Sequence, residues 1–460
     1  MIRRTLMRRA YNAGRWERAR YFAFQIISKP KEQTLARSVV IRSYWNEGNY
    51  SKVLELNEEW DQQFNELLDR NSRTTRSSVN GELQYTGQEQ KWHSEQPTPK
   101  ESEVKFDETE MRNNFYQEGA RLWMKHPNGW TYWDMPVEFQ LDKTHPDLLR
   151  LTAEVLLYPW HKESRQNFEG TREMGSIPAL SFSAGTDSTA AAVVMPKNTI
   201  LAYHRRTLDS ILDHRNAEAL LSRLKNEGRF ILDVPSNHEL IRTYYYKQIG
   251  FSTDFACATH LILLSDLYDI GAIAFGMPLD NTYLWKGRKY RNFSEIEYFQ
   301  YWSKRFNSVG LDLLLPVAGI SEAGCIRICE QSGISEYMNS CLRGDGENGC
   351  GSCWKCFHKN GPLGRPFDIK AREIQTFLHR SPLPTATHAL WALKQLGLES
   401  ETPHLKELLA QDLSWWTEIY PPSEDLIPNR WRQSILENLS HYLEPMTKPY
   451  ALELVNHYSE

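Results

Sequence analysis

The sequence predicts an α/β fold for its central part: a doubly wound, mostly parallel sheet of five strands. From residue 178 onward, short apolar runs alternate with helical patterns, which favours parallel strands with helices on both faces. A Ser- and Gly-rich turn, residues 183–189, directly follows the first apolar run. Four cysteines between residues 341 and 356 follow the last run. Their clustering indicates a small metal-binding subdomain attached to the sheet.

Residues 1–66 are expected to form helices with an internal repeat. The run Asn12-Ala13-Gly14-Arg15-Trp16 returns 34 residues later as Asn46-Glu47-Gly48-Asn49-Tyr50. A 34-residue period with Gly at a helix corner resembles tetratricopeptide repeats, and helical repeat modules usually bind protein. Two copies are few, because such repeats bury their faces against neighbours. An ordinary pair of helical hairpins therefore remains the alternative.

Three further segments flank or connect the predicted sheet. Residues 67–105 are polar and poor in apolar side chains, which predicts a linker without a core of its own. Residues 106–177 are rich in Trp and Tyr and are expected to form a helical, aromatic buttress, with one helix starting near His145-Pro146-Asp147. Residues 363–460 are expected to be helical with Pro-rich joints.

The central domain is assigned to residues 178–362. Its strands are short apolar runs bounded by turn-forming residues, and its helices are longer periodic stretches between them. The expected strands are 179–182, 200–203, 230–234, 272–275 and 313–315, and the expected helices are about 214–226, 255–270 and 321–332.

Composition narrows the classes of protein that the chain can belong to. The net charge of -4 gives no general attraction to nucleic acid or to anionic membranes. No apolar stretch is long enough to cross a bilayer. The seven cysteines are absent from the first 256 residues and cluster late in the chain, which is typical of metal binding in a reducing compartment. We therefore expect a cytoplasmic protein.

The turn after the first strand reads Ser183-Ala184-Gly185-Thr186-Asp187-Ser188-Thr189 and opens a helix of small residues. A ligand at such a junction meets unpaired backbone N–H groups and the positive end of a helix dipole. The turn therefore predicts a cradle for a phosphate chain, with Asp187 placed to hold Mg²⁺ or to shape the loop. It is no Walker A loop, because the lysine of that motif is missing. A plain Ser/Gly-rich turn is the alternative.

The cysteines follow the spacing Cys341-x8-Cys350-x2-Cys353-x2-Cys356. Four thiolates at these spacings can close a tetrahedral zinc site, which is structural because it leaves no open position for a substrate. Lys355 and His358 lie close by in the sequence and would offset the negative charge. An iron–sulfur cluster also uses four cysteines and is the main alternative.

The turn resembles the Ser-Gly-Gly-x-Asp-Ser signature of PP-loop ATP pyrophosphatases, which have a doubly wound sheet of the PP-loop or HUP type. Together with the cysteine spacing it is similar to the zinc-containing 7-cyano-7-deazaguanine synthase family. The resemblance covers about residues 178–362 and implies that Ser183, Gly185, Asp187, Ser188 and Thr189 hold ATP and Mg²⁺, while the four cysteines hold Zn²⁺. Two positions depart from the pattern. Ala184 replaces a glycine, and the run after Gly276 lacks the family's substrate-proximal residues.

The resemblance implies an AMP-forming, Mg-ATP-dependent ligase that activates a carboxylate and transfers it to an amine. The acid would be 7-carboxy-7-deazaguanine or a similar compound. The residues 183–189 and Gly276 are the expected ATP contacts, and Asp187, Ser188, Arg205 and Lys286 are the expected catalytic residues. Arg205 follows the second strand, where a cation could stabilise pyrophosphate, and Lys286 would line the substrate pocket. Solvated basic side chains are the alternative for both.

Two other functions compete with this interpretation. A sulfur transferase acting on tRNA would need a reactive thiol and a basic surface, whereas Cys325 and Cys329 read as core residues on one helix face. A non-catalytic scaffold with a degenerate loop is favoured by Ala184 and by the repeats. The expected partners are ATP, a small carboxylate and a protein bound through residues 1–66; nucleic acid and membranes are not expected.

Overall fold

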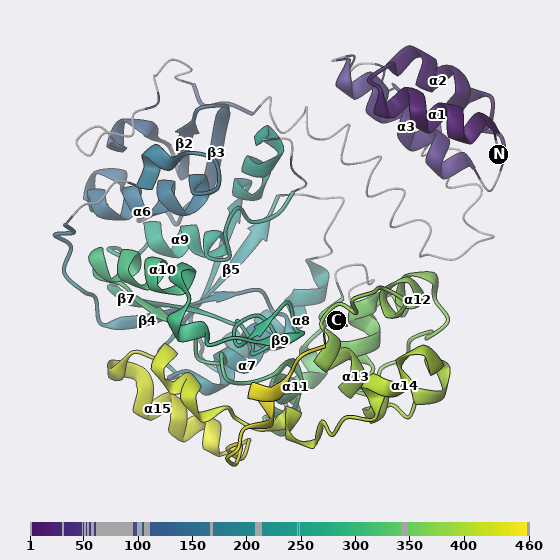
Figure 1. Cartoon of the computed structure of the whole chain (residues 1–460). Coiled ribbons are helices and arrows are strands. Elements are labelled where there is room, and N and C mark those ends of the chain that lie inside the picture. The colour runs from purple at the N-terminus through teal and green to yellow at the C-terminus, as the bar shows by residue number, and fades with distance from the viewer. Residues whose placement is uncertain are drawn as a thin grey trace. The chain divides into compact units, whose positions relative to one another are not determined.

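The structure is a computed structural model that divides into two compact units, Met1–Gln96 and Pro97–Glu460 (Figure 1). The boundary between them falls within the predicted linker 67–105, most of which lies outside the described residues. The described residues are 2–29, 32–47, 49, 52, 55–56, 59–60, 95–98, 104, 111–165, 169–207, 214–245, 247, 249–341 and 348–457.

The first unit is helical, as expected. It contains α1 (Ile2–Asn12), α2 (Trp16–Phe24) and α3 (Gln33–Asn46). Gly14 has a φ of +66° at the corner between α1 and α2, a conformation that favours glycine. The Trp16 ring packs edge-on against Tyr11 at 5.2 Å just beside that corner. In the second copy of the repeat, Gly48 and Tyr50 lie outside the described residues.

The second unit is built on a mixed sheet of eight strands in the described residues, in the order β1-β2-β3-β6-β5-β4-β7-β10. The last five in this order pair in parallel, and β1, β2 and β3 extend the sheet antiparallel. The bounds are β1 (Phe115–Glu118), β2 (Arg121–His126), β3 (Gly129–Asp134), β4 (Ile177–Phe182), β5 (Ile200–Arg206), β6 (Ile231–Ser236), β7 (Ile270–Phe275) and β10 (Asp312–Leu314).

The sheet is larger than the five strands predicted, because residues 106–177 are not mainly helical. The expected helix is present as α6 (Pro146–Leu157), but three strands precede it. Pro127 and Asn128 join β2 to β3, and the Asn128-Gly129 pair at this turn is among the strongest hairpin signals in a sequence. Gly119, at φ +61°, turns β1 into β2. The aromatic side chains of this segment therefore pack on a sheet.

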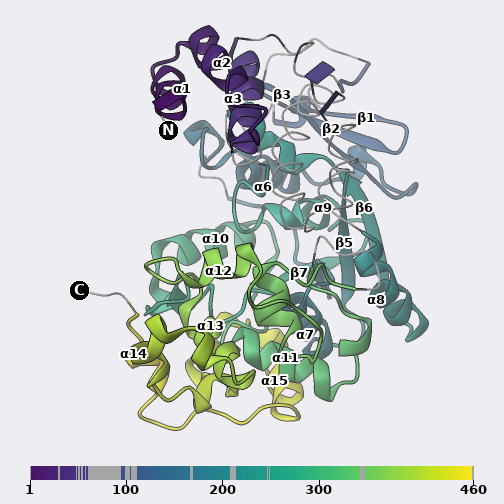
Figure 2. The same ribbon diagram turned by 90° about the vertical axis from the view of Figure 1, so that its right-hand side faces the viewer.

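Helices cover both faces of the sheet (Figures 1 and 2). In β7, Ile273 and Phe275 join one core with α6, α9 (Thr259–Leu263) and α10 (Glu297–Ser308), while Ala272 and Ala274 join a second core. This alternation follows from the period of two along a strand. The second core is covered by α7 (Thr186–Val194), α8 (Arg215–Asn226), α11 (Glu322–Gln331) and α15 (Asn429–Ser440).

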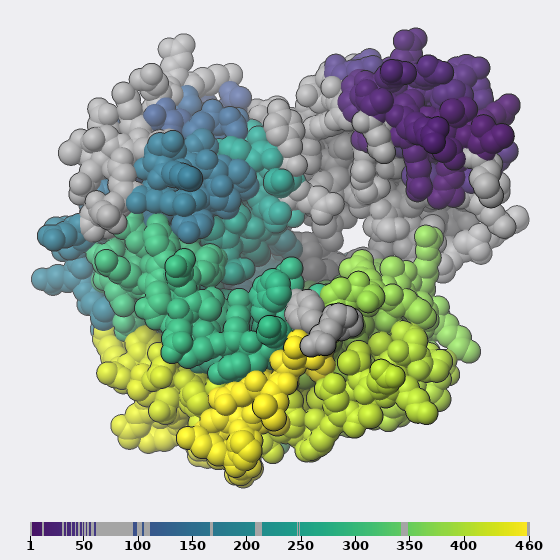
Figure 3. Space-filling view, in the orientation of Figure 1, coloured from purple at the N-terminus to yellow at the C-terminus, as the bar shows by residue number. Residues whose placement is uncertain are grey.

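The C-terminal region is helical, as expected, and packs onto the sheet domain. It contains α12 (Arg372–Leu378), α13 (Ala386–Gln395), α14 (Lys406–Leu409) and α15. The chain end lies beside a small hairpin of β8 (Leu284–Trp285) and β9 (Lys289–Tyr290), where the His457 N–H donates to the Arg288 carbonyl at 2.8 Å. Figure 3 shows this yellow end between the teal and light green segments. None of the helices in the described part of the chain has the length and apolar character that crossing a bilayer requires.

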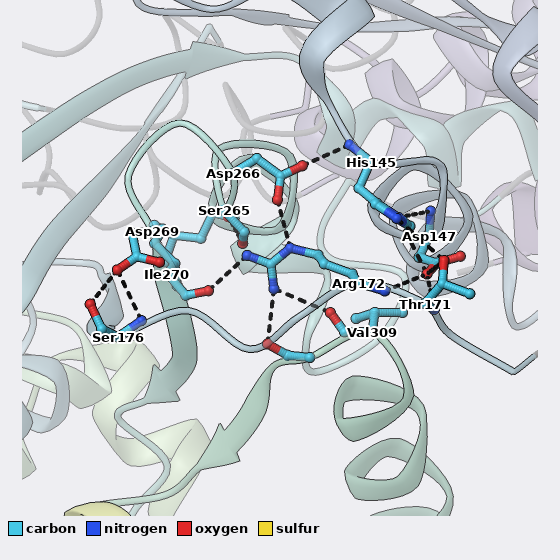
Figure 4. Close-up of polar contacts among 12 residues, drawn as sticks. His145, Asp147, Thr171, Arg172, Ser176, Ser265, Asp266, Asp269, Ile270 and Val309 are labelled. Atoms are coloured by element: carbon cyan, nitrogen blue, oxygen red, sulfur yellow. Dashed lines mark hydrogen bonds and ion pairs between the residues drawn. The ribbon is translucent and has the colours of Figure 1, made fainter.

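At the amino ends of the parallel strands, Arg172 joins three chain segments (Figure 4). Its Nε donates to the Asp266 carboxylate at 2.7 Å, and its Nη2 donates to the Ile270 carbonyl at 3.0 Å. Its Nη1 donates to the carbonyls of Val309 and Gly310 at 3.2 and 2.9 Å. The guanidinium thus ties together the entries to β4, β7 and β10.

Candidate functional site

The predicted phosphate loop lies at the carboxyl end of β4. After β4, the chain forms β5 and β6 on one side and then returns to form β7 and β10 on the other. The strand order therefore reverses between β4 and β7. Open α/β sheets bind ligands at the carboxyl ends of the strands next to such a reversal.

Hydrogen bonds within the loop give it a defined shape. Gly185 is the N-cap of α7. The Ser188 hydroxyl lies 3.0 Å from the Ser183 hydroxyl, accepts from the Ser183 N–H at 3.2 Å and donates to the Gly185 carbonyl at 3.1 Å. Ser183 is exposed, and Gly185 and Asp187 are partly exposed. The open side of the loop therefore presents the exposed Ser183 hydroxyl, whereas Asp187 turns one carboxylate oxygen to Lys359 and has the other buried without a partner among the described residues.

Three loop residues point into the protein. The side chains of Thr186 and Thr189 are buried, so their hydroxyls do not line the open side as the family pattern implies. Ala184 is also buried and has a φ of +56°. This left-handed conformation costs a residue with a Cβ about 1–2 kcal/mol. The departure from glycine noted in the sequence therefore falls at a position where glycine is the favoured residue.

Gly276, an expected ATP contact, lies against the loop at the end of β7. A Cβ built on it would be 2.7 Å from both the N and the Cα of Ser188. Only glycine lets the two segments approach so closely. Gly276 thus sets the spacing between β7 and the first turn of α7.

The four cysteines form a compact cluster, as the spacing predicted. The Sγ atoms of Cys341 and Cys353 are 3.9 Å apart, and those of Cys350 and Cys356 are also 3.9 Å apart. The Cys353–Cys356 separation is 3.6 Å. A tetrahedral ion with bonds of about 2.3 Å requires separations of roughly 3.8 Å, whereas a disulfide requires about 2.05 Å.

The surroundings of the cluster also suit thiolates. All four sulfur atoms lie within 4.8 Å of one another, which leaves room for one ion and not for several irons with bridging sulfides. Backbone N–H groups of Cys350 and Cys356 donate to Cys341 Sγ and Cys353 Sγ at 3.2 and 3.4 Å. A Cβ on Gly349 would lie 3.0 Å from Cys356 Sγ. The donor set therefore fits a single ion that prefers sulfur.

A buried charge network connects the cysteine segment to the loop. Lys359 lies three residues after Cys356, and its Nζ is 2.7 Å from Asp187 Oδ2. The same ammonium is 3.6 Å from Glu322 Oε2, at the start of α11. On the other flank of the cysteines, the Ser340 hydroxyl lies 2.7 Å from the Thr186 hydroxyl and accepts from the Thr186 N–H at 3.3 Å.

The three carboxyl groups of this network have pKa values shifted in different directions, lower for Glu322 and higher for Asp187 and Asp280. Burial opposes ionisation of Glu322, but Lys359 and two neighbouring imidazoles outweigh it and hold the pKa of Glu322 well below its usual range. Burial, opposed in part by Lys359, raises the pKa of Asp187. Burial and the Glu322 charge raise the pKa of Asp280 well above its usual range. Glu322 is thus the carboxyl of this group that ionises most readily, and Asp280 ionises less readily than an ordinary carboxyl.

Glu322, His358 and His388 form a second group of potential metal ligands within 4.8 Å. His388 Nε2 donates to the His358 carbonyl at 2.9 Å and therefore carries a proton. Lys359 Nζ lies 3.6 Å from the shared Glu322 oxygen and would repel a cation there. This group is a buried carboxylate surrounded by N–H donors and not a metal site.

The structure does not bring two of the expected catalytic residues to the loop. Arg205 is engaged by Asp233 and Glu218, at 2.5 and 2.9 Å, on the edge of β5 and β6. Its charge is therefore already compensated. Lys286 lies in the β8–β9 hairpin with its Nζ 4.8 Å from the Trp285 ring. Both positions follow from local partners that the sequence pattern did not reveal.

The remaining cysteines near the loop are core residues, as predicted. Cys325 and Cys329 are fully buried on α11. Burial raises the pKa of both thiols, so neither is a thiolate at neutral pH.

Sequence reasoning missed Lys359, Glu322 and Ser340, all of which belong to the charged or polar network behind the loop. The only available signal was position: Ser340 and Lys359 flank the cysteine motif, and Glu322 opens a predicted helix. A lysine was noted as missing from the loop, and the fold supplies one from a segment 172 residues away.

Comparison with known proteins adds one finding. A family of unknown function, DUF6395, matches residues 301–456. This stretch contains the four cysteines, Glu322 and Lys359, but neither the loop 183–189 nor Gly276. No curated protein and no solved structure matches the chain.

Proposed function

We propose that this protein is an AMP-forming, Mg-ATP-dependent ligase of the PP-loop type that adenylates a carboxylate and transfers it to an amine. The observation that carries the proposal is the position of the Ser183–Thr189 loop. It lies at the carboxyl end of β4, beside the reversal of strand order, with the N-terminus of α7 behind it. The five parallel strands in the order β6-β5-β4-β7-β10 suit a PP-loop fold.

The proposed reaction has two steps. A carboxylate oxygen of the substrate attacks the α-phosphorus of ATP, and the bond to pyrophosphate breaks. An amine nitrogen then attacks the carbonyl carbon, AMP leaves with its bonding electrons, and the nitrogen loses a proton. No nucleophilic side chain is required, so catalysis rests on positioning and on electrostatic stabilisation.

Each polar residue of the loop has its own proposed role in this reaction. The N–H groups at the start of α7 and the Ser183 hydroxyl would bind the phosphate oxygens, while Ser188 holds the loop in shape. Mg²⁺ would neutralise charge on the departing pyrophosphate and would take Asp187 Oδ1, the carboxylate oxygen that Lys359 does not contact. The four cysteines would hold Zn²⁺ in a structural role. The acid is 7-carboxy-7-deazaguanine or a similar compound, and the amine is ammonia or a protein amine presented through the first unit.

The decisive experiment measures AMP and pyrophosphate release from Mg-ATP by the full-length, zinc-loaded protein, with 7-carboxy-7-deazaguanine and ammonium as substrates. Asp187→Asn should abolish release, whereas Asp412→Asn, on an exposed loop of the C-terminal region, should leave it unchanged. Release that requires the acid supports the ligase, and nitrile or amide product identifies ammonia as the acceptor. No release with any acid, together with no ATP binding, contradicts the proposal.

The left-handed conformation of Ala184 favours one alternative function, a non-catalytic scaffold. A loop that costs about 1–2 kcal/mol to form with alanine is what a chain under no selection for catalysis would accumulate. ATP binding without AMP formation, under every substrate condition, would favour the scaffold.

A further inference from the structure

The four-cysteine segment contacts the loop from both of its ends. Ser340 immediately precedes Cys341 and holds Thr186, and Lys359 closely follows Cys356 and holds Asp187. Thr186 and Asp187 are consecutive residues at the start of α7. Two consecutive loop residues are thus fixed by the two flanks of one metal-binding segment.

The geometry after Cys356 makes the position of Lys359 depend on that cysteine. Residues Cys356–Asn360 form a single π-helical turn, which the Gly361 N–H closes on the Cys356 carbonyl at 2.8 Å. Such turns are rare and occur frequently at functional sites. Asn360 Nδ2 also donates to Cys356 Sγ at 3.7 Å. Because the turn begins at Cys356, movement of this cysteine moves Lys359.

The loop depends strongly on the position of Lys359, because this one ammonium faces two carboxylates. The Lys359 side chain is 8% exposed and faces the carboxylates of Asp187 and Glu322. Removing one partner from a buried ion pair is strongly destabilising, because the other charge is left uncompensated. If Lys359 leaves, the first turn of α7 is left with Asp187 unpaired beside the buried Glu322 carboxylate.

Four thiolates within 4.8 Å of one another repel, and a bound cation offsets this repulsion. Metal binding at such sites is coupled to folding of the segment that carries the ligands. We propose that metal bound by the four cysteines controls the nucleotide loop, with Lys359 and Ser340 as positioning residues that hold Asp187 and Thr186. This inference rests on the proposed function for the identity of the ligand, ATP, but not for the coupling itself.

The test uses the full-length protein and two measurements. The first is the affinity for a fluorescent ATP analogue with Mg²⁺, before and after removal of the metal by a chelator. The second is amide hydrogen exchange of residues 186–194, with α6 as an internal reference on the opposite face of the sheet. Metal removal should weaken analogue binding at least tenfold, or by about 1.4 kcal/mol, and speed exchange in α7 more than in α6.

Variants that keep the metal separate the coupling from general unfolding. Lys359→Met and Ser340→Ala should retain one metal ion per chain, weaken analogue binding several-fold and speed exchange at the start of α7. Lys359→Arg should restore most of the binding, because a guanidinium can still pair with Asp187. Ser332→Ala removes a comparable hydroxyl, bonded to the Cys329 carbonyl, and should change neither measurement.

The outcomes separate this inference from the proposed function. If the metal-loaded protein does not bind the analogue, the proposed function fails, while faster α7 exchange without metal still supports the coupling. If analogue binding and α7 exchange are the same with and without metal, the inference is overturned and the function stands. If metal removal speeds exchange in α6 as much as in α7, the loss of metal has unfolded the domain in general. The coupling is then tested with the variants that keep the metal. Unchanged binding and exchange in Lys359→Met and Ser340→Ala would then overturn the coupling.

Discussion

Arg172, at the amino ends of the parallel strands, has all its donors paired, whereas several of the described polar groups around the loop at the carboxyl ends lack partners. At the amino edge, Arg172 donates to Asp266 and to the carbonyls of Ile270, Val309 and Gly310 (Figure 4). At the carboxyl edge, in the part of the chain that the structure describes, Asp187 Oδ1, Asp280 Oδ1 and Thr189 Oγ1 are buried without a hydrogen-bond partner.

Each such unmade hydrogen bond costs about 1–3 kcal/mol, so a fold keeps several of them together only where a ligand supplies partners or where selection is weak. The amino edge is built to hold strands in place. The loop at the carboxyl ends has buried polar atoms without partners among the described residues, which lowers the stability there.

The largest expected effect breaks the amino edge. Arg172→Met removes a donor from three carbonyls and from Asp266, which keeps the His145 N–H. At about 1–2 kcal/mol for each buried bond that is lost, we expect the free energy of unfolding to fall by about 3–5 kcal/mol. Arg205→Met is the matched control, because Arg205 also makes several hydrogen bonds, to two carboxylates, but its side chain is 29% exposed, so its loss should cost about 1 kcal/mol or less. Urea unfolding measures both, and equal losses would contradict the comparison.

The second prediction concerns pH and the buried imidazoles near the carboxyl edge. His204 stacks on His238 at 4.3 Å between ring centroids, and His260 lies 5.9 Å from His204. Burial lowers the pKa of His260 to about 4. Above pH 6.5 this residue is neutral in both states. As the pH falls from about 6.5 to 4, only the unfolded chain takes up the proton, and stability falls by about 1.4 kcal/mol per pH unit.

His260→Asn removes this contribution. The substitution itself lowers the free energy of unfolding at neutral pH. Below pH 6.5, however, the free energy of unfolding of the variant should decline less steeply than that of the wild type. The difference should amount to about 3 kcal/mol between pH 6.5 and 4. Parallel curves for the two proteins would show that His260 titrates normally in the folded state.

The third prediction tests the close approach of β7 to the loop. Gly276→Ala places a Cβ 2.7 Å from the Ser188 backbone, which must shift at a cost of about 1–3 kcal/mol. ATP binding should weaken with it. Gly119→Ala, at φ +61° with no atom within 4 Å, should cost about 1 kcal/mol from backbone strain alone and leave ATP binding intact. Equal ATP binding by both variants would show that Gly276 does not set the loop.

The smallest effect is expected at Ala184. Ala184→Gly relieves about 1–2 kcal/mol of backbone strain. Against this, it loses a buried methyl worth about 0.8 kcal/mol, and the greater conformational entropy of glycine stabilises the unfolded chain by about 0.4–1 kcal/mol. The free energy of unfolding should therefore change by less than about 1 kcal/mol. Ala191→Gly, buried in the middle of α7, has no strain to relieve and should cost about 2 kcal/mol. Similar losses at the two positions would show that Ala184 is unstrained.

Much of the central fold could be predicted, because it rests on local signals. The expected strands 179–182 and 200–203 fall within β4 and β5, and the expected helix 321–332 matches α11 closely. Aromatic content does not distinguish helix from strand in residues 106–177, where the strand signal is the Asn128-Gly129 pair at the β2–β3 turn. The four-cysteine cluster was visible because its ligands lie within sixteen residues of one another.

The sequence by itself determined the α/β class, the loop at the end of a strand, and the cysteine cluster, since each depends on residues close together in the chain. Only the tertiary structure decided which side chains surround the loop. Lys359 reaches Asp187, Ser340 reaches Thr186, and Arg205 is captured by Asp233. Such pairings are long-range because folding brings together segments that are distant in the chain, and the buried Lys359 pairs because an unpaired buried charge is too costly to leave.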